Sequence, residues 1–292
     1  MDSELIFLSI ALLGTLSGSI FDIKDRWVPD WTNYLMVFFG LAGHAIISLQ
    51  ANSIWPFAHS LIAVAILYGV SELLFQLGVW GGGDAKMLIG LGALLATFPN
   101  NLMPLLINWP FLLTFWTNSL IFGGLLGFFG SIYLAVRHFN KFLNSAKKYL
   151  QKKYIQYSLI AALIAIPIAF FFDKLTAFVL GIIFLLALML ISLKSIEEAC
   201  MFKTISPKKL VEGDWVTDEI NIEGVYYVPN RTGIEKKDIL KLIELENIGK
   251  LKNITVKEGL PYVPAFFLGL VSAVWLGDLM FLLVIRLFAF GF

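Results

Sequence analysis

Two aspartates stand where apolar segments of the chain end or begin. Asp22 closes the first apolar segment in the run SIFDIKDRWVPD, and Asp84 opens the fourth in the run GGGDAK. An ionised side chain at the centre of a membrane span costs about 2.5–3.5 kcal/mol on insertion scales, so acids near membrane depth point to a function. These two carboxylates are therefore the first candidates for chemistry.

Two facing carboxylates are the minimum that aspartyl proteolysis requires. Like charges within a few ångströms cannot both ionise, so such a pair shares one proton. The ionised member activates a water molecule, and the protonated member donates to the oxygen of the scissile carbonyl. The positive end of a helix favours a carboxylate and the negative end opposes it. We therefore predict that Asp84, at a helix start, is the base and that Asp22, at a helix end, is the acid.

The glycines before Asp84 suit a site that admits a peptide. Without a Cβ, Gly81, Gly82 and Gly83 can adopt dihedrals closed to other residues and let a substrate backbone approach. The helix that follows, 85–98, has 14 residues. At about 1.5 Å per residue it covers about 21 Å of a core of about 30 Å, so either the bilayer thins locally or the Asp84 end lies below the headgroups. Both outcomes would bring the carboxylate to the depth at which a substrate helix ends. A helix continuing past Pro99 to Ile107 would remove this inference.

Nearby ionisable side chains are candidates for supporting roles, each with a simpler explanation. Lys24, Arg26 and Lys86 are explained equally well by the excess of basic residues on the inner side of membrane proteins. Glu72 can serve the site or hydrogen-bond a neighbouring helix. Outside this region, His44 and His59 have no His or Cys at ligand spacing, so packing explains them. Two further acids are expected near the outer face, away from the pair: Asp173 and Asp278.

Composition indicates the elements that must position these residues. Hydrophobic residues make up 58% of the 292 residues, the charged fraction is 15% and the mean hydropathy is +0.80. About 20 apolar residues are needed to cross a bilayer as a helix, and lipid-exposed backbone must satisfy its own hydrogen bonds. We therefore predict an all-α polytopic membrane protein with about eight transmembrane helices: 5–21, 33–49, 57–79, 86–98, 109–136, 155–172, 175–193 and 262–285.

Basic residues set the orientation in the membrane. With the N-terminus outside, nine of the 11 basic residues that lie outside the segment 194–260 fall on the inner side. This asymmetry predicts a multi-pass protein of the cell membrane with Asp22 and Asp84 both at the cytoplasmic face. The first apolar segment lacks a basic start and a small-residue cleavage site, so it is predicted to remain as a span.

One segment has the composition of a soluble module. Residues 194–260, the insert, hold 11 basic and 12 acidic residues and are predicted to form a small cytoplasmic α+β unit. Residues 225–228 are predicted as a strand, and Thr232 with Glu235 as a capping box that opens a helix through about Glu246. The expected organisation is a transmembrane catalytic core, a basic cytoplasmic connection, a transmembrane hairpin, the insert and a C-terminal transmembrane helix: 1–136, 137–154, 155–193, 194–260 and 261–292.

The motifs resemble those of a known family. They are similar to the type IV prepilin peptidases, specifically the archaeal preflagellin peptidase branch, among the Gly-x-Gly-Asp membrane aspartic proteases. Three matches carry the resemblance: Asp22-Ile23-Lys24-x-Arg26-x-Val28-Pro29-Asp30, then Gly81-x-Gly83-Asp84-x-Lys86, and more weakly 257–264 with a later Gly277-Asp278. The aspartates at the positions of Asp22 and Asp84 are the catalytic pair of that family, so the resemblance implies the same roles here.

The resemblance also implies a substrate and an activity. The substrates would be precursors with a short basic leader and a hydrophobic N-terminal helix, such as preflagellins and type IV prepilins, cut at the cytoplasmic face. Bifunctional bacterial members carry a four-cysteine module and methylate the product. The single cysteine, Cys200, cannot supply that module, so we expect a leader peptidase without N-methyltransferase activity, cofactor or zinc. Simpler members have six spans, so 155–193 is the expected additional hairpin.

Other classes of protein remain as alternatives. A transporter or channel would carry its acids near the midplane, in broken helices of two matching halves. A presenilin-type intramembrane protease shares the Gly-x-Gly-Asp loop, but its other aspartate is expected after a tyrosine, and Asp22 follows Phe21. A membrane scaffold would be indifferent to acid-to-amide changes. The net charge of +1 gives no indication of a nucleic-acid partner, and the sequence does not define the oligomeric state.

Overall fold

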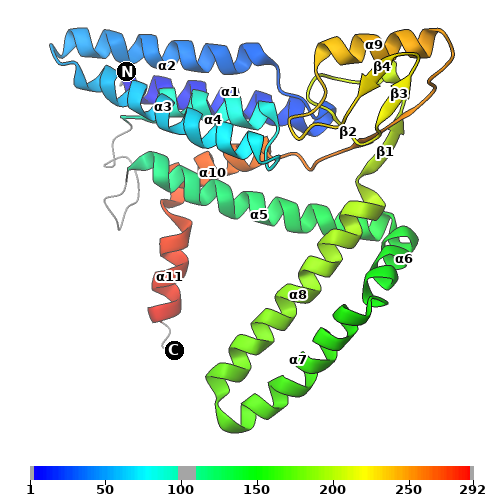
Figure 1. Cartoon of the computed structure of the whole chain (residues 1–292). Helices are drawn as coiled ribbons and strands as arrows, with labels where there is room; N and C mark the ends of the chain where they lie inside the picture. Colours follow the sequence, from blue (N-terminus) through cyan, green and yellow to red (C-terminus); the bar gives the residue numbers. More distant parts are fainter. Residues whose placement is uncertain (1–2, 98–109, 290–292) are drawn as a thin grey trace.

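The computed structural model describes residues 3–97 and 110–289, with side chains up to 284, and this part of the chain is mainly helical (Figure 1). Six helices within it are long and apolar enough to cross a membrane. A small unit of strands and one helix interrupts them. The prediction of an all-α polytopic membrane protein with an α+β insert is confirmed.

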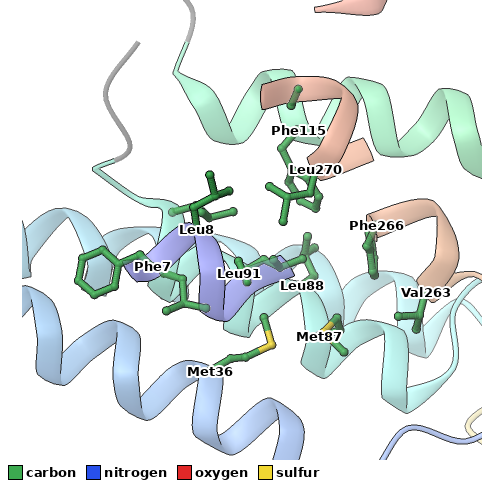
Figure 2. Packing of buried hydrophobic residues seen from close by; sticks show 14 of the residues in the cluster. Phe7, Leu8, Met36, Met87, Leu88, Leu91, Phe115, Val263, Phe266 and Leu270 are labelled. Carbon is green, nitrogen blue, oxygen red and sulfur yellow. The ribbon is translucent and has the colours of Figure 1, made fainter. Parts of the chain in front are cut away.

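The first four helices form one packed group around the shortest of them. Helix α4 contacts all three of the others, whose long axes run side by side in Figure 1. Side chains from α1, α2 and α4 interlock in the hydrophobic core, where Met36, Met87 and Leu91 lie together (Figure 2). The bounds are α1 (Ser3–Asp25), α2 (Asp30–Gln50), α3 (Trp55–Gln76) and α4 (Gly82–Leu95).

Helix α4 is as short as the sequence predicts. It has 14 residues, but it begins and ends about three positions earlier than expected. The alternative of a helix running on to Ile107 lies outside the described residues. Nine of the 14 residues of α4 are buried, because neighbouring helices cover it along its length. The short helix is therefore a central element of the core.

Close contact between α2 and α4 depends on Gly40. A Cβ at this position would lie 2.6 Å from the carbonyl carbon of Ala93, so the α4 backbone would have to move. We expect Gly40→Ala to lower the free energy of unfolding by about 1–3 kcal/mol, measured as thermal unfolding in detergent. Gly69→Ala is the matched control, since nothing lies within 4 Å of its Cβ position. Equal stability of the two variants would contradict this packing role.

The next helices lead away from the core and return as a hairpin. Figure 1 shows α7 and α8 side by side, extending away from the packed group. No residue of α7 is buried, and α8 buries only three, so the apolar surfaces of both helices are free to face lipid. Helix α6 carries the basic connection predicted over 137–154. The bounds are α5 (Phe111–Arg137), α6 (Phe139–Leu150), α7 (Lys153–Phe172) and α8 (Lys174–Cys200).

The C-terminal span differs from the single helix expected over 262–285. The chain forms α10 (Val263–Leu276) and α11 (Leu279–Ala289), separated by Gly277 and Asp278. Gly277 has a φ of +74°, which ends α10, and Asp278 accepts a hydrogen bond from the N–H of Phe281 at 2.8 Å. Asn118 of α5 accepts the N–H of Leu279 at 2.9 Å. These partners satisfy the backbone at the break, so two helices replace one.

The insert folds around a hydrophobic cluster of its own. Its three-stranded antiparallel sheet has the order β1-β5-β2, and β3 pairs with β4 in a separate hairpin. Buried side chains of the sheet and of helix α9 form the cluster, among them Val216, Leu242 and Ile254. The bounds are β1 (Phe202–Ile205), β2 (Trp215–Val216), β3 (Ile220–Ile222), β4 (Val225–Tyr227), α9 (Lys236–Asn247) and β5 (Ile254–Lys257), with a short 3₁₀ turn η2 (Pro207–Lys209).

Two local expectations for the insert need correction. The strand at Val225 is present, but the capping box is not. Helix α9 begins at Lys236 without a side-chain cap, and the N–H of Thr232 donates to the side chain of Asn230. A hydrogen bond to the side chain of Asn230, within the turn, thus forms in place of the predicted capping box. The first residues of the insert, 194–200, continue helix α8.

Candidate active site

Asp22 is held where α1 meets the start of α10. Its side chain is 8% exposed, and Oδ2 accepts a hydrogen bond from the N–H of Val263 at 3.0 Å. One turn earlier on α1, a Cβ at Gly18 would overlap the methyl group of Met87 and lie 3.2 Å from Cγ1 of Val263. A glycine here lets α1 approach α4 and α10 closely, which brings the Asp22 carboxylate between them.

Asp84 lies in the first turn of α4. Its Oδ2 accepts a hydrogen bond from the N–H of Gly81 at 3.0 Å, which fixes the side chain over the helix start. The expectation of special glycine dihedrals is wrong at Gly81, whose φ of −77° and ψ of 162° suit any residue. At Gly83 the absence of a side chain matters because it permits close packing: a Cβ there would lie 3.1 Å from Cβ of Val28.

Asp22 and Asp84 open onto the same pocket. This aspartate pocket has a volume of about 550 Å³, and Gly81, Gly82 and Gly83 line it as well. The charge of Asp22 acts on Asp84 directly, so the two carboxylates are electrostatically coupled. Side chains that are 62 positions apart in sequence therefore line one pocket at one end of the helix group.

The helix termini do not distinguish the two carboxylates. Asp84 lies at the start of α4, and Asp22, although it ends α1, is bonded to the N–H of Val263 at the start of α10. Each carboxylate therefore faces the positive end of a helix dipole. The prediction that Asp84 is the base and Asp22 the acid rested on unequal helix ends, and the structure removes that inequality.

The basic residues named from the sequence fall into different places. Lys86 lines the pocket and pairs with Asp30, with Nζ 2.6 Å from Oδ1. Arg26 also lines the pocket, and its Nε lies 3.7 Å from a carboxylate oxygen of Glu258. Lys24 is exposed and is not among the described lining residues. Two of the three candidates are therefore at the site, each next to an acid.

Glu72 of α3 also lines the pocket, and its Oε1 accepts a hydrogen bond from Nε2 of Gln76 at 2.7 Å. The residue before it, Ser71, was not identified from the sequence. Its side chain is 1% exposed and lines the pocket, and Oγ has no hydrogen-bond partner in the described part of the chain. A serine in an apolar helix carries no sequence signal that separates it from an ordinary packed residue.

The insert contributes a wall of the pocket that sequence reasoning missed. The loops 211–214 and 232–235 line the pocket together with residues of the membrane helices that carry the aspartates. Figure 1 shows the insert beside the C-terminal end of α1. The insert thus meets the candidate site in space, although its nearest loop lies more than 120 positions after Asp84.

Tyr262 lies beside the site at the start of α10. Its ring packs against Trp80 and Phe266, with ring centroids 5.3 Å apart in both cases. The weak third motif at 257–264 pointed to this segment, but not to the hydrogen bond from the N–H of Val263 to Asp22.

The other sequence candidates lie elsewhere. The ring of His44 is bonded to the carbonyl of Gly40 and to Oγ1 of Thr97, at 2.7 and 2.8 Å, so it is a packed histidine as expected. Asp173 caps α8, and Asp278 caps α11. Neither of these acids lines the aspartate pocket.

Apolar helices around a coupled pair of carboxylates define the class: a polytopic membrane protein with an acidic site at one end of its helix group. The model of the type IV leader peptidase family matches residues 6–135, a region that contains both aspartates. No solved structure matches the chain significantly.

Relatives support the same family. A preflagellin peptidase of Methanocaldococcus jannaschii is 33% identical over 89 residues, which are 30% of this chain and 38% of the relative. A preflagellin peptidase of Methanococcus voltae is 34% identical over 94 residues, 32% of this chain and 40% of the relative. Prepilin peptidase EppA of Methanothermobacter thermautotrophicus is 23% identical over 98% of this chain and 97% of its own. The matches to the preflagellin peptidases thus span well under half of those proteins.

Proposed function

We propose that this protein is a membrane-embedded aspartic endopeptidase that removes the leader from preflagellin- or prepilin-like precursors. The observation that carries the proposal is the meeting of Asp22 and Asp84 in one pocket at the ends of α1 and α3–α4. The family match over residues 6–135 and the peptidases among the relatives support it. The distribution of basic residues favours a pocket that faces the cytoplasm.

The proposed reaction uses one proton shared by the pair. The ionised aspartate takes a proton from water, and the resulting hydroxide attacks the carbonyl carbon of the leader's last residue. The protonated aspartate donates to the carbonyl oxygen as the tetrahedral species forms. The N–H groups of Gly81 and Val263 hold the two carboxylates in position through this exchange. Collapse of the tetrahedral species breaks the C–N bond. The leaving amine takes the proton that the first aspartate removed from water, and the other aspartate regains its proton from a hydroxyl of the tetrahedral species.

Loss of the leader from a purified precursor tests the proposal. The protein in detergent is mixed with a preflagellin or a type IV prepilin, and the product is followed by its mass and its new N-terminal sequence. We expect a single cut between the basic leader and the hydrophobic helix. An unchanged precursor, with a protein that remains folded and monodisperse, would contradict the proposed activity.

A further inference from the structure

The wall that the insert gives to the pocket is a defined structure. The loops 211–214 and 232–235 are joined by backbone hydrogen bonds, from Gly213 N–H to the carbonyl of Ile234 at 3.0 Å and from Ile234 N–H to the carbonyl of Asp214 at 2.9 Å. Gly213 and Gly233 both have positive φ, at +95° and +86°, which lets the loops lie in contact. The wall therefore presents its side chains to the pocket in fixed positions.

The pocket has a strong excess of negative charge. Its described lining includes eight carboxylates and two basic side chains. Lys86 is already paired with Asp30, and Arg26 with Glu258. Even with one proton shared by the catalytic pair, the charges left facing the pocket are acidic. A positively charged partner would be attracted to this pocket, and an anionic lipid or nucleic acid would be repelled.

Three of these carboxylates come from the insert: Glu212, Asp214 and Glu235. Glu235 pairs with the exposed Lys237, and Glu212 makes no ion pair or hydrogen bond within the described residues. Burial raises the pKa of Asp214, an effect that the N–H of Val211 opposes and the charge of Glu258 reinforces. A cation close to such a carboxylate would relieve this cost, because opposite charge favours the ionised form.

Ser71 gives independent evidence that the pocket takes a ligand. Serines in these helices normally donate to a carbonyl of their own helix, as Ser19 and Ser119 do. The buried Oγ of Ser71 has no such partner in the described part of the chain, and Ser71 is one of the residues that line the pocket. Buried hydroxyls are nearly always hydrogen-bonded, so a missing partner is expected from a bound molecule.

We propose that the insert is the part of the active site that recognises positive charge: Glu212 and Asp214 bind a basic peptide segment on the leader side of the scissile bond. The inference rests on the proposed function and names the substrate contacts that select for it. The acids fit an extended basic segment better than a single ion. In the described part of the chain, no three His, Cys, Asp or Glu side chains converge as a metal-ligand set.

The test compares two double variants of the full-length protein. In Glu212→Gln/Asp214→Asn two of the three negative charges of the wall are removed, and the acceptor for the Val211 N–H is kept. In Glu219→Gln/Glu244→Gln, the matched control, two exposed acids of the insert outside the pocket are changed in the same way. The substrates are a synthetic peptide with a lysine-rich start and an apolar continuation, and its analogue with glutamine in place of lysine.

We expect the wall variant to raise KM for the lysine peptide by about tenfold with kcat unchanged, because charge pairing contributes mainly to binding. The control should match the wild type. The difference between variants should disappear with the glutamine peptide, and it should shrink at high ionic strength, since exposed charges are screened. Equal KM values of the two double variants for the lysine peptide would overturn the inference and leave the peptidase activity standing.

A binding experiment separates this inference from the proposed function. Fluorescence anisotropy of the labelled lysine peptide is measured with the Asp22→Asn/Asp84→Asn protein, with and without the wall substitutions. Tight binding that depends on Glu212 and Asp214 supports the inference even where no protein variant cleaves any precursor, in which case only the proposed function fails. Binding that is insensitive to the wall substitutions overturns the inference, whatever the cleavage assay gives.

Discussion

Asp22→Asn and Asp84→Asn are each expected to lower cleavage of a preflagellin or prepilin by about 10³-fold, the scale of general acid–base catalysis. An amide can neither accept a proton from water nor donate one as an acid, so either change removes a necessary half of the reaction. Asparagine is nearly isosteric and can still accept the N–H of Val263 or Gly81. The variants should therefore express and fold like the wild type.

Asp173→Asn is the matched control for the aspartate pair. It makes the same chemical change at a helix end, where Asp173 accepts the N–H groups of Leu175 and Thr176, and it lies outside the pocket. Full activity is expected, since asparagine is as good a helix cap as aspartate. The measurement is the rate of leader loss at saturating precursor, beside a melting curve of each variant. Substantial cleavage by either amide variant of the pair would exclude the proposed mechanism.

Gly233→Ala is the second change with a large expected effect. A Cβ at Gly233 would overlap the backbone of Gly213, 2.7 Å from its Cα, and no side-chain rotation can relieve a clash with backbone. The φ of +86° adds about 1–3 kcal/mol of strain for a residue other than glycine. The two loops of the wall should separate. We expect a loss of affinity for the lysine-rich peptide of about tenfold or more, read from KM and from anisotropy.

Gly224→Ala is the control for backbone strain alone. Gly224, in the β3–β4 turn, has a φ of +82°, and nothing lies within 4 Å of its Cβ position. It should lower the stability of the insert by a similar strain energy without changing the pocket. Wild-type KM in Gly233→Ala would show that the joined loops do not form part of the binding site.

Much of the fold could be predicted because long runs of apolar residues indicate membrane-spanning helices without any knowledge of tertiary contacts. The long apolar segments define α1, α2, α3, α5, α7 and α8, since a chain in lipid must form helices. The break at Gly277 and Asp278 was missed because hydropathy continues across it. Whether such a pair ends a helix depends on partners such as Asn118, which supplies the missing hydrogen bonds from α5.

The candidate site also has features that the sequence predicts and features that only the tertiary structure shows. Sequence by itself determined the pair of Asp22 and Asp84, because an acid next to an apolar helix is costly and two such acids at one membrane face suggest one chemistry. Only the tertiary structure decided that Val263 holds Asp22, that Ser71 lines the pocket and that the loops of the insert close it. Those features are contacts between distant segments, and no spacing along a chain specifies which distant backbone will meet which side chain.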